Sequence, residues 1–154
     1  MGIEIERKFL VASDGWRGAV SSSTPFSQGY LSRDPARTVR VRIAGERAFL
    51  TIKGATTGAT RAEFEYAVPL ADARELLALC DGPVVEKVRH LCVVEGMTWE
   101  VDEFLGANAG LVVAEIELEH EAQRFPRPAW LGQEVTGDAR YVNANLAVRP
   151  YSSW

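Results

Sequence analysis

Charged and apolar side chains alternate along most of the chain, and this alternation constrains the fold more than any other feature. The first such segment reads Glu4-Ile5-Glu6-Arg7-Lys8, and the last reads Ala114-Glu115-Ile116-Glu117-Leu118-Glu119. A period of two places successive side chains on opposite faces of a β-strand. The pattern therefore predicts strands with one ionic face and one apolar face. The predicted strands span residues 3–12, 28–32, 37–44, 47–53, 61–68, 85–95, 98–104 and 111–119.

Helical patterns are fewer, and the segments that carry them are short. Residues 72–80 have good helix formers with one apolar face, and Gly82 and Pro83 follow the segment. A second short helix is expected near the C-terminus, with Asp138 as its N-cap. The expected helices cover 72–80 and 139–147, with weaker patterns at 14–22 and 121–125, and the expected loops cover 21–25 and 54–60. Several hairpin-linked strands with few short helices indicate an α+β protein.

Length and charge exclude several classes of protein. The 154 residues fit one domain, which we expect to span residues 1–154. The sequence has no apolar run long enough for a membrane helix and no secretory signal at its N-terminus, so we expect no membrane partner. The net charge of −4 argues against general nucleic-acid binding, which needs a basic surface. Two cysteines are too few for a disulfide scaffold, so we expect a cytoplasmic protein.

The ionic faces carry like charges at next-but-one positions of the same strand. Examples are Arg40 with Arg42, and Lys87 with Arg89. One explanation is a plain structural barrel or sheet, whose charges merely pair across strands. The ionic faces are, however, almost entirely Glu, Asp, Arg and Lys, whereas ordinary wet faces also carry many Ser, Thr, Asn and Gln. Like charges this close repel unless a bound group compensates them.

A metal–polyphosphate complex would compensate both signs of charge. Carboxylates are the hard oxygen ligands that Mg²⁺ or Mn²⁺ prefers, and Lys and Arg side chains bind phosphate oxygens. If the sheet closes into a barrel, every ionic face can point inward, and helices such as 72–80 can cover part of the apolar outside. The sequence thus predicts a closed eight-stranded antiparallel β-barrel, a tunnel with a charged lumen and short helices packed outside.

An ordered series of short motifs runs through nearly the whole chain. The motifs are E-x-E-x-K at 4–8, Q-G-Y-L at 28–31, R-V-R at 40–42, T-I-K at 51–53, R-x-E-x-E at 61–65, E-K-V-R at 86–89, W-E-V-D at 99–102, A-E-I-E-L-E at 114–119 and G-D-x-R-Y-x-N-x-x-L at 137–146. The series resembles that of the CYTH superfamily, also called triphosphate tunnel metalloenzymes, and especially its short, single-domain bacterial members. The resemblance implies metal-dependent hydrolysis of inorganic tripolyphosphate to diphosphate and phosphate, with Mg²⁺ or Mn²⁺. Short relatives are often homodimers, so a homodimer is also considered.

The resemblance implies a role for individual residues. The implied metal ligands are Glu4, Glu6, Asp102, Glu115 and Glu117. The implied phosphate-binding residues are Lys8, Arg40, Arg42, Lys53, Lys87, Arg89 and Arg140. Lys8 and Tyr30 match a Lys–Tyr pair implicated in catalysis in the short relatives. Glu63, Glu65 and Glu100 match further positions of the lumen.

Other functions stay open at this point. Relatives often carry extra lysines in the last motif, where this chain has Ala139, Val142 and Ala144. That departure leaves room for a polyphosphate- or nucleotide-binding module without turnover. Thiamine triphosphate or a nucleoside triphosphate is an alternative substrate for the same fold. Adenylate cyclase activity is disfavoured, because the chain has no room for the histidine-containing motif that precedes E-x-E-x-K in those relatives.

Overall fold

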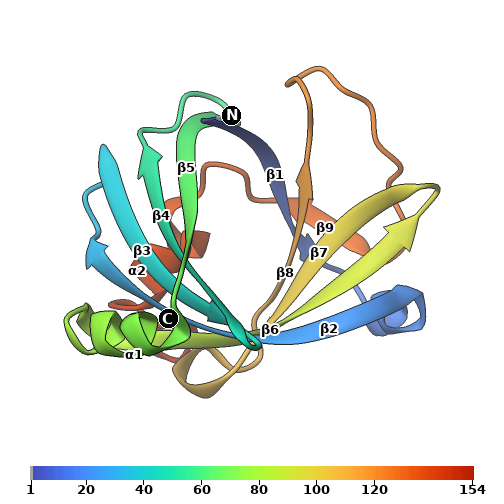
Figure 1. Cartoon of the computed structure of the whole chain (residues 1–154). Helices are drawn as coiled ribbons and strands as arrows, with labels where there is room; N and C mark the ends of the chain where they lie inside the picture. Colours follow the sequence, from blue (N-terminus) through green and yellow to red (C-terminus); the bar gives the residue numbers. More distant parts are fainter. Residues whose placement is uncertain (1) are drawn as a thin grey trace.

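The chain folds into a closed antiparallel barrel, and the computed structural model describes residues 2–154 of it. The barrel closes in the order β1, β5, β4, β3, β2, β6, β7, β8 and back to β1 (Figure 1). A ninth strand, β9, pairs with the end of β1 outside this circuit. The predicted fold is therefore confirmed. The strands are β1 (Ile3–Val11), β2 (Val20–Ser32), β3 (Arg37–Ala44), β4 (Arg47–Gly54), β5 (Thr60–Val68), β6 (Asp81–Val94), β7 (Met97–Phe104), β8 (Val112–Glu117) and β9 (Leu131–Glu134).

Strand β1 closes the barrel because its two halves have different neighbours. Residues 3–5 pair with β5, whereas residues 6–10 pair with β8. This register places Lys8 directly opposite Glu115. Since side chains alternate along a strand, the same register directs the charged face of β1 into the barrel.

Burial is inverted relative to an ordinary sheet protein. On β4, Thr51 and Lys53 are buried, whereas Ile52 between them is 37% exposed. On β5, the apolar side chains of Phe64 and Tyr66 are 46% and 57% exposed. The ionic faces therefore point into the barrel, and the apolar faces point out, as the alternation predicts.

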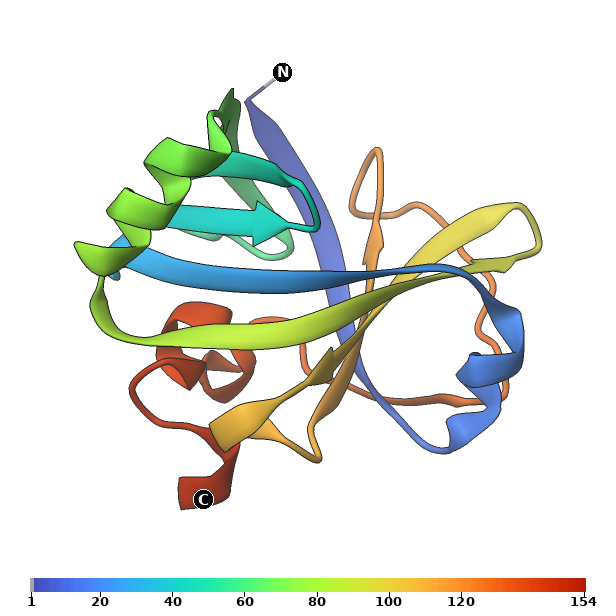
Figure 2. The same cartoon turned by 60° about the horizontal axis from the view of Figure 1, so that its bottom comes forward.

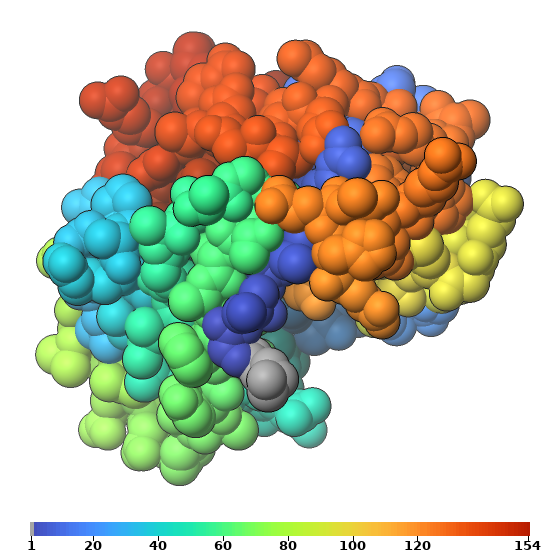
Figure 3. Space-filling view, turned by 90° about the horizontal axis from the view of Figure 1, so that it is seen from above, coloured from blue at the N-terminus to red at the C-terminus, as the bar shows by residue number. Residues whose placement is uncertain are grey.

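Two apolar clusters cover much of the outside. Helix α1 (Leu70–Ala78) packs on β3 and β4, where Ala73 joins Val41 and Ala48 in a buried cluster (Figure 2). A second cluster on β1, β7 and β8 is built around three buried tryptophans: Trp16, Trp99 and Trp130. It is covered by the short helix η1 (Asp14–Ala19) and by the segment after β8, which lies beside the start of β1 in Figure 3.

The C-terminal segment fills one end of the barrel interior. It contains η3 (Ala139–Tyr141), which Asp138 caps as predicted, and α2 (Asn143–Leu146). Tyr141 and Leu146 join a buried cluster with Val85 and Phe104, which lie on the inward faces of their strands. This end of the interior is apolar and closed, so the charged part lies further along the barrel.

The structure corrects several expected element boundaries. Residues 21–25 belong to β2 instead of a loop, since they pair with β6 beyond the end of β3. One neighbour is missing there, and such an edge tolerates Pro25. The helix expected over 139–147 is interrupted at Val142, where the backbone is extended.

Two further helix expectations need correction, and one strand was not expected. Residues 14–22 form a short 3-10 helix and then enter β2, and residues 121–125 begin in a turn and continue without regular structure. Strand β9 was not predicted, because four residues that include Gly132 carry no sustained alternation. The remaining short helices are η2 (Gly106–Asn108) and η4 (Tyr151–Ser153). Within residues 2–154, every helix is too short or too polar to cross a membrane.

Candidate functional site

The charged part of the interior encloses a cavity of about 200 Å³. Its wall carries acidic and basic side chains in equal number, contributed by seven strands, while Val142, Asn143 and Ala144 of the C-terminal segment also line it. The acidic residues are Glu4, Glu6, Glu63, Glu65, Glu100, Glu115 and Glu117, and the basic residues are Lys8, Arg40, Arg42, Lys53, Arg61, Lys87 and Arg89. The cavity is therefore built to hold both signs of charge.

Two groups of carboxylates are close enough to share a cation. One consists of Glu4, Glu6 and Glu117, and the other of Glu6, Glu100 and Glu115. In each group the carboxylate oxygens lie within 4.8 Å of one another. Glu6 belongs to both groups, so it sits between two adjacent sites that suit hard divalent cations.

The protonation of these carboxylates is strongly perturbed by burial and by their neighbours. Burial raises the pKa of Glu6 well above its usual range, and the adjacent Glu115 raises it further. Burial also raises the pKa of Glu100 to about 7, against the opposing charge of Arg89. For Glu115, burial is outweighed by Lys8 and other charges, which hold its pKa well below the usual range. A bound cation would favour the ionised form of carboxyl groups whose pKa is raised in this way.

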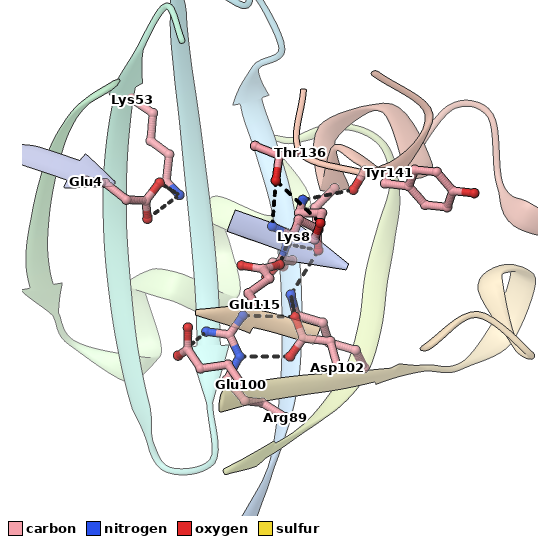
Figure 4. Close-up of polar contacts among 12 residues, drawn as sticks. Glu4, Lys8, Lys53, Arg89, Glu100, Asp102, Glu115, Thr136 and Tyr141 are labelled. Carbon is pink, nitrogen blue, oxygen red and sulfur yellow. Dashed lines mark hydrogen bonds and ion pairs between the residues drawn. The ribbon is translucent and has the colours of Figure 1, made fainter. Parts of the chain in front are cut away.

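The wall formed by β4 and β5 is held by ion pairs. The ammonium of Lys53 lies 3.2 Å from Glu4 (Figure 4). Lys53 also lies 3.2 Å from Glu63, and Arg61 lies 3.1 Å from Glu4. Burial alone would raise the pKa of Glu4, but Lys53 and Arg61 lower it to about 2. Glu4 is therefore ionised in the folded protein at neutral pH.

The opposite wall holds a network of buried charges on β6 and β7. Arg89 donates to both oxygens of Asp102 at 2.8 and 2.9 Å and to Glu100 at 3.0 Å (Figure 4). Lys87 donates to Asp102 at 2.7 Å, and burial lowers the pKa of Lys87 to about 7 although Asp102 opposes that shift. Asp102 is fully buried, and its oxygens are taken by these two cations.

Lys8 and Tyr30 both line the cavity, but each has a different partner. The Lys8 ammonium donates to the carbonyl of Tyr141 at 3.1 Å and lies 3.8 Å from Glu115. The Tyr30 hydroxyl accepts from Gln28 at 2.9 Å. In the described part of the chain, no hydrogen bond joins Lys8 to Tyr30 directly.

Most of the residues singled out in the sequence meet around the cavity, and two do not. Arg140 in η3 is exposed, pairs with Asp138 at 2.9 Å and is not among the lining residues. Asp102 lies on the inward face of β7, but it is fully buried and is absent from the lining residues and from both carboxylate groups. Sequence reasoning placed Arg61 on an ionic face and Asn143 in the last motif, but it gave neither residue a role. Only the closure of β1 on β5 and the docking of α2 bring these two to the site.

The chain is thus an antiparallel β-barrel that encloses a charged cavity with two adjacent carboxylate groups. These features define the class of barrel proteins with a charged tunnel. The chain belongs to the CYTH domain family, which matches residues 2–151. Fold, inward charge and family thus agree.

Named relatives come from two bacteria. The chain is 48% identical over 155 residues to a protein named inorganic triphosphatase from Acetivibrio thermocellus, covering 100% of this chain and 99% of that one. It is 38% identical to a protein of the same name from Nitrosomonas europaea, covering 94% and 97%. The crystal structure of the inorganic triphosphatase NE1496 matches the fold with a TM-score of 0.67 and 36% identity, over 94% of each chain.

Proposed function

We propose that this chain is an inorganic triphosphatase that hydrolyses tripolyphosphate to diphosphate and phosphate inside the tunnel. The observation that carries the proposal is the cavity wall, where two carboxylate groups sharing Glu6 face a basic wall within one enclosed space. The names of the two full-length relatives support the same activity.

The basic side chains of the wall are proposed to bind the phosphate oxygens. Each of the three phosphate groups of tripolyphosphate carries negative charge on its oxygens, so binding needs several cationic donors in a row. Arg40 and Arg42 on β3 offer planar guanidinium groups, which suit phosphate geometry. The proposed phosphate-binding set is Lys8, Arg40, Arg42, Lys53, Lys87 and Arg89, with Arg61 added and Arg140 left out.

The carboxylate groups are proposed to bind Mg²⁺ or Mn²⁺. The donors are all carboxylate oxygens, which is the chemistry that such ions select, and burial together with neighbouring carboxylates raises the pKa values of Glu6 and Glu100. When bound, a divalent cation would neutralise phosphate charge and polarise the scissile bond. The proposed ligands are Glu4, Glu6, Glu100, Glu115 and Glu117. Asp102 is proposed instead to orient Lys87 and Arg89.

Phosphoryl transfer to water passes through a loose transition state, so positioning and charge stabilisation dominate catalysis. The basic wall fixes the substrate and stabilises charge on its non-bridging oxygens. The closed apolar end of the barrel excludes water from one side of the substrate. Lys8 and Tyr30 are proposed to donate to the reacting phosphate or its leaving oxygen from the two sides of the lumen.

An inorganic substrate is favoured over an organic triphosphate by what surrounds the tunnel mouth. A second cavity of about 350 Å³ shares Glu4, Glu6 and Lys8 with the first and opens beside Arg33. None of its lining residues is aromatic, so a nucleobase or a thiazolium ring would find no side chain to stack on. Thiamine triphosphatase, nucleoside triphosphatase and a binding module without turnover are the outcomes against which the proposal is tested.

The test is phosphate release from tripolyphosphate, thiamine triphosphate and ATP, each with Mg²⁺ and with Mn²⁺. We expect fast metal-dependent release from tripolyphosphate that is lost in Glu6→Gln. The matched control is Glu75→Gln on the exposed side of α1, which we expect to behave as the wild type. Preference for an organic substrate would change the substrate assignment, and binding without release would overturn the proposed activity.

Three broader expectations accompany this proposal. We expect one domain spanning residues 1–154, a cytoplasmic location and no nucleic-acid or membrane partner. A homodimer is also considered, by analogy with short relatives. Fractionation and size-exclusion chromatography with light scattering test the location and the oligomeric state.

A further inference from the structure

We propose that Asn143 binds the substrate directly, by donating its side-chain amide N–H groups to a phosphate oxygen in the tunnel. This inference rests on the proposed triphosphatase function and adds a neutral donor to the otherwise cationic wall. Asn143 is the first residue of α2 and lines the cavity between Val142 and Ala144.

The oxygen of the Asn143 side chain is engaged by two donors from the barrel wall. Its Oδ1 accepts from the ammonium of Lys87 at 2.9 Å and from Nε2 of Gln28 at 3.1 Å. Lys87 and Gln28 are themselves buried, with 1% and 0% exposure. Two buried donors therefore hold one side of the amide against the barrel wall.

The orientation of this amide follows from chemistry and not only from geometry. A lysine ammonium can only donate, so the atom facing Lys87 must be the Asn143 oxygen. The Gln28 amide is fixed in the same way, because its Oε1 accepts from the guanidinium of Arg42 at 2.9 Å, and guanidinium can only donate. Gln28 must then present its nitrogen to Asn143, so both contacts demand the same orientation.

With the oxygen fixed, the nitrogen of Asn143 is left facing the space that the residue lines. Among the described residues, Nδ2 makes no hydrogen bond, and it does not belong to the fully buried side-chain atoms that lack a partner, so solvent reaches it. An amide nitrogen carries two N–H donors. These donors therefore reach open space in a cavity lined with phosphate-binding cations.

Helix α2 is well anchored, so the donor is pre-positioned. Ala144 and Leu146 are 4% and 1% exposed, and both belong to the apolar cluster that fills the end of the barrel. A donor on a rigid element loses little conformational entropy when it binds. A neutral amide also adds a hydrogen bond to the substrate without repelling the neighbouring cations.

The first test measures the binding of tripolyphosphate to the metal-free protein in EDTA by calorimetry. We expect Asn143→Ala to weaken binding by about 10- to 100-fold, the range for a hydrogen bond to a charged group. Asn145→Ala is the matched control, because that amide also belongs to α2 but donates to the backbone of Ala139 at 2.8 Å. We expect it to lower the melting temperature without a comparable loss of affinity.

A double-mutant cycle separates direct contact from an effect through Lys87. If Asn143 contacts the substrate, Asn143→Ala weakens binding by a similar factor in the wild type and in Lys87→Met. If it only positions Lys87, the substitution has no effect in the Lys87→Met background, and the proposal is overturned.

A second measurement does not depend on the folding of Lys87→Met or on turnover. The side-chain amide resonances of ¹⁵N-labelled wild type are followed during titration with tripolyphosphate in EDTA. We expect the Asn143 side-chain protons to move downfield on saturation while those of Asn145 stay in place. Saturable binding with no movement of the Asn143 signal contradicts the proposal. Absence of any binding or phosphate release by the wild type would instead refute the triphosphatase function itself.

Discussion

Lys87 and Asp102 form an ion pair that solvent does not reach, with Nζ 2.7 Å from Oδ2 and side-chain exposures of 1% and 0%. Arg89 holds both oxygens of the same carboxylate. Asp102 therefore acts as the counter-charge for two cations that face the cavity. A carboxylate occupied in this way supports the phosphate-binding wall and not the metal groups.

Replacing Asp102 by Asn is expected to destabilise the protein strongly. It leaves the buried Lys87 without its counter-charge and Arg89 with Glu100 alone, and breaking a buried pair costs about 3–5 kcal/mol. Chemical denaturation measures this loss. At temperatures where the variant is folded, the metal ion should still stabilise it. An unchanged free energy of unfolding together with a loss of metal binding would instead identify Asp102 as a metal ligand.

Replacing Glu6 by Gln is expected to separate stability from function. The Glu6 carboxyl is crowded by Glu115, so its neutral isostere should leave the metal-free protein as stable as the wild type or more stable. The same change removes the ligand that both carboxylate groups share, so the rise in melting temperature with Mg²⁺ should disappear. Thermal melts with and without Mg²⁺ decide this, and a retained Mg²⁺-dependent shift would contradict the shared site.

The metal-free protein is expected to be less stable at pH 7.5 than at pH 5. Glu100 has a pKa of about 7 when folded, so the folded protein holds a proton that the unfolded chain releases near 4.5. This contribution to stability is present below pH 4.5 and is lost as the pH rises to about 7, by roughly 2–4 kcal/mol. Glu6 acts in the same direction.

Melts in EDTA across this pH range test the direction of that change. The carboxylates whose pKa values are lowered, such as Glu4 at about 2, lose their contribution only at lower pH and do not reverse the trend. Saturating Mg²⁺ should flatten the profile, since the cation holds the carboxylates ionised. A metal-free protein that becomes more stable from pH 5 to pH 7.5 would contradict the assigned shifts.

Lys8 and Tyr30 are expected to contribute separately to turnover. Because each has its own partner in the wall, Lys8→Met and Tyr30→Phe should each lower kcat by about 10²–10⁴-fold, the range for a lost proton-transfer group. The losses should multiply in the double variant. A double variant no slower than either single one would mean that the two residues act as one unit.

The sequence was sufficient to predict which charged side chains point into the barrel, but not which ion pairs they form there. Alternation along β1 and β3 assigns Glu6 and Arg42 to the lumen, because the charged and apolar side chains of each strand lie on opposite faces and the apolar faces pack on the outside. Asp102 obeys the same alternation, yet packing of β6 against β7 places two cations on its oxygens. The alternation pattern does not show that Lys87 and Arg89, instead of a metal ion, bind these oxygens.

The C-terminal segment shows the same limit. Its composition predicts a helix near 139–147. It does not predict that extended backbone at Val142 interrupts this helix, or that Asn143 accepts a hydrogen bond from Lys87. Arg140 belongs to a motif that matches the family, and still its side chain pairs with Asp138 outside the cavity. The positions of these residues depend on how the apolar side chains of the C-terminal segment pack in the end of the barrel, and such tertiary packing is not visible in the local sequence.

The most direct measurement of the central claim is anomalous diffraction from crystals of the protein grown with Mn²⁺ and tripolyphosphate. The account predicts manganese inside the barrel, bound by Glu6 with Glu4 and Glu117 or with Glu100 and Glu115, and phosphate oxygens against Arg40, Arg42 and Asn143. Manganese bound on the outer surface, with an empty or merely hydrated tunnel, would contradict it.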